Sequence, residues 1–149
     1  LPILDQVYPM DCSITRVAVA NEAEKRAGNN TTFGRKGIIP YGLYRCNGFV
    51  SAFRARNNGF NEADLELFWE ALLNMFEHDR SASRGIMSAQ KLIVFKHATA
   101  LGKYPAQKLF ERVVVTKKPG VVFPRSFSDY EVKVNKEGLP SSIEIIEML

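Results

Sequence analysis

One segment of the sequence carries a clear helical pattern. Residues 61–79 contain six acidic residues and no lysine or arginine. Asn61 is a typical N-cap residue, and Glu62 and Asp64 would lie in the first turn, where the helix dipole favours carboxylates. The spacing predicts an amphipathic helix from about residue 61 to 79, whose apolar face anchors a core. That face consists of Leu65, Phe68, Trp69, Leu72, Leu73 and Phe76.

Short β-forming segments surround this helix. Apolar and polar residues alternate over 130–134, which is typical of a strand with one buried face. Strands are also predicted for residues 12–19, 41–53, 91–96, 110–116 and 143–146, and a short helix for residues 104–109. A chain of 149 residues with these elements is expected to form one α+β domain. In it, an antiparallel sheet would pack against the long helix.

The segment 21–40 is too long and polar for a simple turn. It would join the predicted strands 12–19 and 41–53, and connections beyond ~12–15 residues without secondary structure are usually functional or disordered. The connection carries Arg35 and Lys36 between two glycines, which let a backbone turn or approach a ligand closely. The aromatic residues that follow in 41–53 fit base stacking, and they also fit an ordinary strand beside a solvated basic turn.

Charge is unevenly distributed along the chain. The formal net charge is +4. Residues 12–60 hold eight Lys and Arg against two acids, and residues 80–125 hold ten against Glu111 alone. The acidic segment 61–79 separates these two basic blocks. This segregation favours a surface that binds a polyanion such as single-stranded nucleic acid, with a surface of other character elsewhere.

Candidate phosphate contacts lie in both basic blocks. They would form a groove if both blocks adjoin one face of the sheet. Residues 47–53 also faintly resemble the Gly-Phe-Val-x-Phe part of the RNP1 strand of RNA-recognition modules, although Phe53 falls one residue late. The candidate RNA-binding residues are Arg16, Lys25, Arg26, Phe33, Arg35, Lys36, Arg45, Arg80, Arg84 and Lys91.

Catalytic chemistry finds little support in the sequence. His78 and His97 lie in different predicted elements, and no His/Cys group has metal-ligand spacing. A Walker-type loop and a G-x-S-x-G elbow are also absent. We therefore expect no enzyme, no metal and no cofactor. A metal-independent ribonuclease that uses His78 or His97 with a lysine is the alternative.

The composition indicates a protein of the cytoplasm. No apolar run approaches the ~20 residues that span a bilayer, and the chain opens without a signal-peptide pattern. The two cysteines, Cys12 and Cys46, are most simply reduced thiols, with a disulfide or a metal pair as the less favoured interpretations. We expect a cytoplasmic protein with no membrane partner.

Several blocks of sequence, in a fixed order, resemble one known family. The chain is similar, from about residue 9 to its end, to the crRNA-binding backbone subunit of the type I-C CRISPR Cascade effector complex. The blocks are residues 13–19 (SITRVAV), 34–44 (GRKGIIPYGLY), 69–82 (WEALLNMFEHDRSA), 124–130 (PRSFSDY) and 145–149 (IIEML).

The resemblance implies an RNA-recognition-like or ferredoxin-like palm with an extended thumb, repeated head to tail along the CRISPR RNA. Residues 21–40 correspond to the thumb that reaches a neighbouring copy, and residues 80–90 to a loop along the guide. The implied partners are crRNA, target DNA through the guide, further copies of the chain and other Cascade subunits. Nuclease activity is not implied. The family's first strand is missing here, so we expect the C-terminal portion of such a subunit, with an unpaired sheet edge.

Three functional hypotheses therefore stand. The first is a non-catalytic guide-RNA-binding subunit that forms filaments and presents the guide for pairing. The second is the metal-independent ribonuclease. The third is a purely structural fragment that contacts proteins through the acidic helix. Salt-sensitive binding of single-stranded RNA separates the first from the third, and cleavage of labelled RNA identifies the second.

Overall fold

The computed structural model describes residues 9–16, 22–26, 28, 32–81 and 85–149. The chain divides into two compact units. Unit 1 comprises Leu1–Cys46 and Lys117–Tyr130, and unit 2 comprises Asn47–Thr116 and Glu131–Leu149. Helices and antiparallel strand pairs make up the described elements. This confirms the predicted α+β class and is compatible with an RNA-recognition-like or ferredoxin-like fold.

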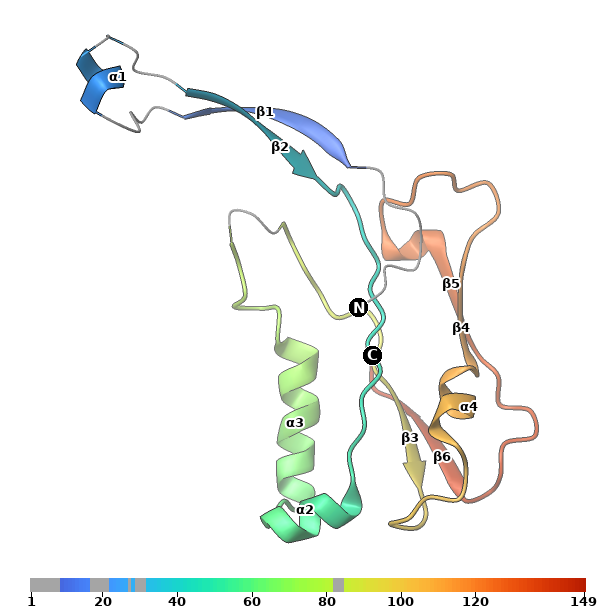
Figure 1. Cartoon of the computed structure of the whole chain (residues 1–149). Helices are drawn as coiled ribbons and strands as arrows, with labels where there is room; N and C mark the ends of the chain where they lie inside the picture. The colour runs from blue at the N-terminus through green and yellow to red at the C-terminus, as the bar shows by residue number, and fades with distance from the viewer. Residues whose placement is uncertain (1–8, 17–21, 27, 29–31, 82–84) are drawn as a thin grey trace. The chain divides into compact units, whose positions relative to one another are not determined.

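A two-stranded hairpin dominates unit 1. Strand β1 (Met10–Arg16) pairs antiparallel with β2 (Thr32–Ile38), and a short helix, α1 (Glu22–Arg26), lies in the connection between them (Figure 1). The pairing contradicts the prediction that Arg35 and Lys36 occupy a loop, because both are strand residues. Gly34 does not form a turn. Its missing side chain leaves room for Ile14 on the opposite strand, because a Cβ atom at position 34 would lie 3.2 Å from Ile14 Cγ1.

The partner of the first strand was predicted wrongly. Residues 41–53 form no strand; instead, residues 52–58 form helix α2 (Ala52–Asn58). The Ser51 hydroxyl accepts a hydrogen bond from the Arg54 N–H at 3.4 Å and so caps this helix. Gly59, at φ 72°, ends it in the left-handed conformation that glycine adopts readily. The capping residues at the two ends of the helix therefore outweigh the preference of the aromatic residues for a strand. The RNP1-like interpretation of residues 47–53 is wrong, because that motif requires a strand.

Helix α3 (Glu62–Asn74) begins where it was predicted and ends earlier. The Asn61 side chain accepts from the N–H groups of Ala63 and Asp64, while Asp64 accepts from the Asn61 N–H at 2.9 Å, which completes a capping box. The early end has a local cause: the Asn74 amide donates to the Glu70 carbonyl at 2.9 Å, a bond that competes with further helical bonding. No α3 side chain is fully buried: Leu65, Trp69, Leu72 and Leu73 of its predicted apolar face are half-buried, and Phe68 is 41% exposed.

The remaining strands form two further antiparallel pairs. Strand β3 (Ile93–His97) pairs with β6 (Ile143–Glu147), with Phe95 opposite Ile145. Strand β4 (Val113–Lys117) pairs with β5 (Tyr130–Val134), and the short helix α4 (Ala106–Phe110) precedes β4. These elements confirm the strands expected at 91–96, 130–134 and 143–146 and the helix at 104–109. The strand expected from residue 110 starts at Val113, since Phe110 still belongs to α4.

Few side chains are deeply buried in the described part of the chain. Leu109, Tyr130 and Ile143 are the buried apolar residues there, at 2%, 7% and 6% exposure. Leu109 lies in α4, where the sequence predicted a short helix without assigning it a central role. The burial of α4 and β6 residues shows that unit 2 packs around its C-terminal half.

Leu109→Ala should therefore destabilise the protein strongly. Removing a fully buried leucine side chain costs about 2–5 kcal/mol through lost burial and the cavity left behind. Chemical denaturation monitored by circular dichroism measures the change in unfolding free energy. Leu101→Ala is the matched control, because Leu101 is 84% exposed and its truncation should change stability by less than about 0.5 kcal/mol. Equal effects of the two substitutions would contradict this description of the core.

Candidate nucleic-acid interface

The net positive charge of the protein resides in unit 1. The sequence of unit 1 holds nine Lys and Arg against five Asp and Glu, a net charge of +4. Unit 2 holds eleven of each and is neutral overall. A surplus of positive charge concentrated in one compact unit attracts polyanions more effectively than the same charge spread evenly. Unit 1 is therefore the candidate nucleic-acid interface.

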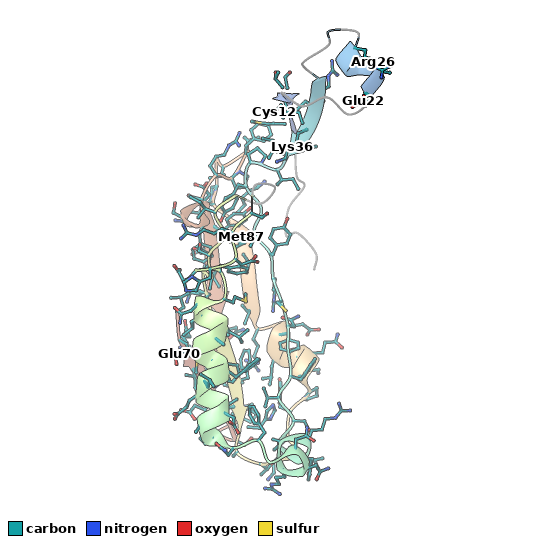
Figure 2. The ribbon with its side chains drawn as sticks, turned by 90° about the vertical axis from the view of Figure 1, so that its left-hand side faces the viewer. Cys12, Glu22, Arg26, Lys36, Glu70 and Met87 are labelled. Carbon is teal, nitrogen blue, oxygen red and sulfur yellow. The ribbon has the colours of Figure 1, made fainter. Side chains whose placement is uncertain are left out.

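The hairpin places its two central cations on opposite faces. Directly opposed residues of an antiparallel pair share a face, and neighbours along a strand alternate. Arg35 lies opposite Ser13, whereas Lys36 lies opposite Cys12, and Figure 2 labels Cys12 and Lys36 on the hairpin. The two cations cannot form the single phosphate clamp that their adjacency in the sequence suggests.

These two faces also differ in chemistry. On the Arg35 face, to which the register also assigns Phe33, the side chains of Asp11, Ser13, Thr15 and Arg35 are polar and exposed. The Lys36 face is largely apolar, and its described side chains are Met10, Cys12, Ile14, Lys36 and Ile38. Hydroxyl groups beside a guanidinium suit a sugar–phosphate backbone, while the apolar face suits a protein surface.

Other predicted site residues lie along the same hairpin. Arg16 ends β1, Phe33 lies opposite Thr15 in β2, and Lys25 belongs to α1. Arg26, labelled with Glu22 in Figure 2, is highly exposed, and its guanidinium nitrogen lies 3.9 Å from the Glu22 carboxylate. Exposed ion pairs of this kind contribute little free energy, so Arg26 can exchange Glu22 for a phosphate readily.

The chain leaving the hairpin packs against the start of β5. The rings of Tyr41 and Tyr130 stack with centroids 6.3 Å apart. Burial, together with the negative charge of Asp129, raises the pKa of Tyr41, so its hydroxyl stays protonated and neutral at physiological pH. Arg45, another predicted site residue, lies half-buried four residues further on. The aromatic residues of this stretch thus serve partly as packing.

A second basic segment of unit 1 was missed by the sequence-based prediction. Residues 118–129, here called the 118–129 loop, connect β4 to β5. The loop carries Lys118 and Arg125, with Lys117 just before it, and its exposed residues include Val122 and Phe123. The sequence signal was present, because residues 112–128 contain basic residues and no acid. This segment was counted within the basic block 80–125, but no candidate phosphate contact was chosen from it.

Asp129 fixes the shape of the 118–129 loop. Its carboxylate accepts hydrogen bonds from the N–H groups of Arg125 at 2.7 Å and Ser126 at 3.0 Å. These bonds, with a contribution from the charge of Lys118, hold the pKa of Asp129 below its ordinary value. The Lys118 N–H also donates to the Asp129 carbonyl at 2.9 Å, which closes the base of the loop. The loop is therefore preorganised from its two ends.

The predicted site residues of unit 2 have different surroundings. Lys91 Nζ lies 2.8 Å from a Glu147 carboxylate oxygen, and Lys136 Nζ lies 3.4 Å from the other oxygen. These two ammonium groups lower the pKa of Glu147. Arg80 is exposed beyond α3, and Arg84 lies outside the described residues. The structure gives Lys91 a role in holding β6, which weakens its candidacy as a phosphate contact.

Catalytic groups do not converge in the described part of the chain. His97 lies in β3 with its Nδ1 buried and without a hydrogen-bond partner, and His78 is exposed beyond the end of α3. Across the described residues, no three His, Cys, Asp or Glu side chains are placed to hold a metal ion. Within those same residues, no helix is both long and apolar enough to cross a membrane.

Removing the Asp129 carboxylate should loosen the 118–129 loop. In Asp129→Ala, the Arg125 and Ser126 N–H groups lose their acceptor, so their hydrogen exchange should accelerate. Because the pKa of Asp129 is lowered in the folded protein, its stabilising effect is present at neutral pH and is lost as the pH falls through that lowered value. NMR shifts of the two amides should titrate with a midpoint below the ordinary Asp pKa of about 3.9.

Asp64→Ala provides the matched control for this experiment. Asp64 makes an equivalent bond in unit 2, because its carboxylate accepts from the N–H group three residues earlier, that of Asn61, at the start of α3. Its removal should speed exchange at Asn61 and leave Arg125 and Ser126 unchanged. If Asp129→Ala alters neither amide of the loop, or if Asp64→Ala alters them equally, Asp129 does not organise the loop.

Comparison with known proteins identifies the family of the chain. The family model described as "CRISPR-associated protein Cas7" matches residues 3–135, which is most of the chain. A search of curated proteins found no match. The matched range includes the whole β1–β2 hairpin and the 118–129 loop. The chain belongs to the Cas7 family of CRISPR-associated proteins.

Proposed function

We propose that this protein is a non-catalytic subunit that binds CRISPR RNA and polymerises along the guide as the backbone of a type I-C Cascade complex. In this role it presents the guide for pairing with target DNA and acts in the cytoplasm beside other Cascade subunits. Membership of the Cas7 family supports the CRISPR setting. The observation that carries RNA binding is the confinement of the whole net charge of +4 to unit 1.

The hairpin is proposed as the thumb of the subunit. Residues 21–40, which the sequence suggested for this role, include helix α1 and the whole of β2. A paired strand is stiffer than the open loop that was expected, so the hairpin can carry side chains to a fixed position on a partner. We assign the exposed, polar Arg35 face to the RNA backbone and the apolar Lys36 face to protein contact between copies.

Substitutions of Arg35 and Lys36 should have different effects on RNA binding. Each phosphate neutralised on a single strand contributes about 0.7 to the slope of log affinity against log salt concentration. Arg35→Ala should reduce that slope by about 0.7, because Arg35 lies on the proposed RNA face. Lys36→Ala should leave it unchanged. Fluorescence anisotropy of a labelled single-stranded oligoribonucleotide over a salt series measures both slopes.

Lys36→Ala serves as the matched control, since the two residues are neighbours of like charge in one strand. Equal reductions for the two substitutions, or a reduction for Lys36 alone, would contradict the assignment of faces. Wild-type binding that does not depend on salt would remove the electrostatic basis of the proposed function and would favour a purely structural role.

RNA should remain intact in the presence of the protein. A ribonuclease of this kind needs an acid and a base close together, whereas His97 lies at the end of β3 and His78 lies beyond the end of α3. End-labelled single-stranded RNA, incubated for hours with and without a divalent cation and resolved on a denaturing gel, should show no new fragments. Fragments that disappear with His78→Ala or His97→Ala would establish the ribonuclease alternative.

A further inference from the structure

The backbone of strand β3 bonds to β6 along one edge only. The Ala98 N–H donates to the Ser142 carbonyl at 2.9 Å, and the Met148 N–H donates to the Leu92 carbonyl at 3.0 Å. Given the antiparallel register, the even-numbered residues of β3 therefore direct their N–H and C=O groups toward β6. The odd-numbered residues direct the same groups to the opposite edge, here called the outer edge of β3. Figure 1 shows the β3–β6 pair, which belongs to unit 2.

Three residues line the outer edge of β3 with unpaired backbone groups. They are Ile93, Phe95 and His97, and within the described part of the chain nothing forms a hydrogen bond with their outward N–H and C=O groups. All three residues are half-buried. A backbone group that is partly removed from water loses free energy unless it is paired. Another strand supplies N–H and C=O groups at the matching spacing, so the outer edge is chemically suited to strand addition.

The sequence of β3 is typical of a strand with a neighbour on each side. Residues 92–95 are all apolar, a pattern found in strands of a sheet interior. Natural edge strands usually carry charges or close their edge with other groups. The outer edge of β6 is protected in this way, because the Ile143 N–H donates to the Pro140 carbonyl at 3.0 Å and Glu147 lies beside two lysines. The outer edge of β3 has no comparable closure among the described residues.

The two faces of the β3–β6 pair specify the side chains of an added strand. Phe95 lies on one face, opposite Ile145, so an apolar side chain beside it would extend an apolar surface. Lys96 lies on the other face, opposite Glu144. Its Nζ is also 4.0 Å from a Glu62 carboxylate oxygen, and both of these side chains are exposed, at 58% and 75%. Such an exposed ion pair contributes little free energy, so an acidic residue of an added strand would still be attracted to Lys96.

We propose that the outer edge of β3 binds an extended strand of a partner protein, which joins the sheet antiparallel to β3, as β6 does. The strand presents an apolar residue opposite Phe95 and an acidic residue opposite Lys96. A second copy of this chain fits less well, because β3 paired with itself would place two Lys96 side chains on one face as diagonal neighbours, where like charges repel. This docking site goes beyond the proposed RNA binding and does not depend on it.

A synthetic strand tests this docking site. The fluorescent peptide Thr-Val-Glu-Ile-Thr-Val-Thr, in antiparallel register, places its isoleucine opposite Phe95 and its glutamate opposite Lys96. Fluorescence anisotropy with the full chain should show saturable binding. Methylating the backbone nitrogens of its second, fourth and sixth residues removes the N–H groups that face β3, so binding should weaken roughly tenfold or more. Replacing its glutamate with lysine should weaken binding about threefold.

The matched control is the same peptide methylated at the backbone nitrogens of its third and fifth residues. These N–H groups point away from β3, so the control should bind within about twofold of the unmodified peptide. Native-state hydrogen exchange locates the site on the protein. With the peptide bound, the amides of Ile93, Phe95 and His97 should exchange about tenfold more slowly. The Ile145 amide, which points to the outer edge of β6, should exchange at an unchanged rate.

Several results would overturn the inference, and each leaves the proposed RNA binding untouched. Absence of saturable binding would remove the docking site. Equal binding of the two methylated peptides would indicate apolar contact without strand pairing, and unchanged binding of the lysine peptide would remove the acidic partner. Protection of Ile145 instead of the β3 amides would place the strand on β6. Sedimentation of the protein alone as a dimer, with the β3 amides protected, would identify a second copy as the occupant.

Discussion

The described part of the chain depends on local polar bonding because few apolar side chains are fully buried. Leu109, Tyr130 and Ile143 alone reach deep burial there. Order comes instead from residues that bind their own backbone, as Asn61 and Asp64 do at α3 and Asp129 does in the 118–129 loop. Arg112 acts similarly: its guanidinium donates to the carbonyls of Asn135 and Glu137 and so holds the turn after β5. Such bonds define local shape at modest gain in free energy.

The small number of buried apolar side chains has a functional consequence. Large apolar side chains that a self-contained domain would cover remain exposed, including Phe49, Leu67 and Ile86. Exposed apolar groups on this scale are typical of proteins that complete their packing against a partner. The proposed polymerisation along a guide RNA would supply such a partner through neighbouring copies. The apolar Lys36 face of the hairpin fits the same requirement.

Secondary-structure prediction from the sequence succeeded where the signal lies within a few neighbouring residues. It failed where two signals favoured different structures for the same residues. The N-cap at Asn61 and the alternation over 130–134 were recognised because each signal is contained in a few residues. Residues 41–53 misled because aromatic residues favour strands, while Ser51 and Gly59 specify the ends of a helix. The pairing of β1 with β2 could not be deduced, since register depends on which strands meet. That register separates Arg35 from Lys36, which neighbouring positions in the sequence suggested would act together.

The location of the candidate interface is related to the number of acidic side chains in each unit and to the groups that they contact. In unit 2, carboxylates neutralise lysines across the structure: Glu147 lies beside Lys91 and Lys136, and Glu62 lies 4.0 Å from Lys96. In unit 1, Glu22 lies 3.9 Å from Arg26, and the Asp129 carboxylate accepts hydrogen bonds from backbone N–H groups. The surplus of positive charge in unit 1 therefore comes from the number of its cations, nine against five acids, and Asp129 shapes the loop that carries Lys118 and Arg125.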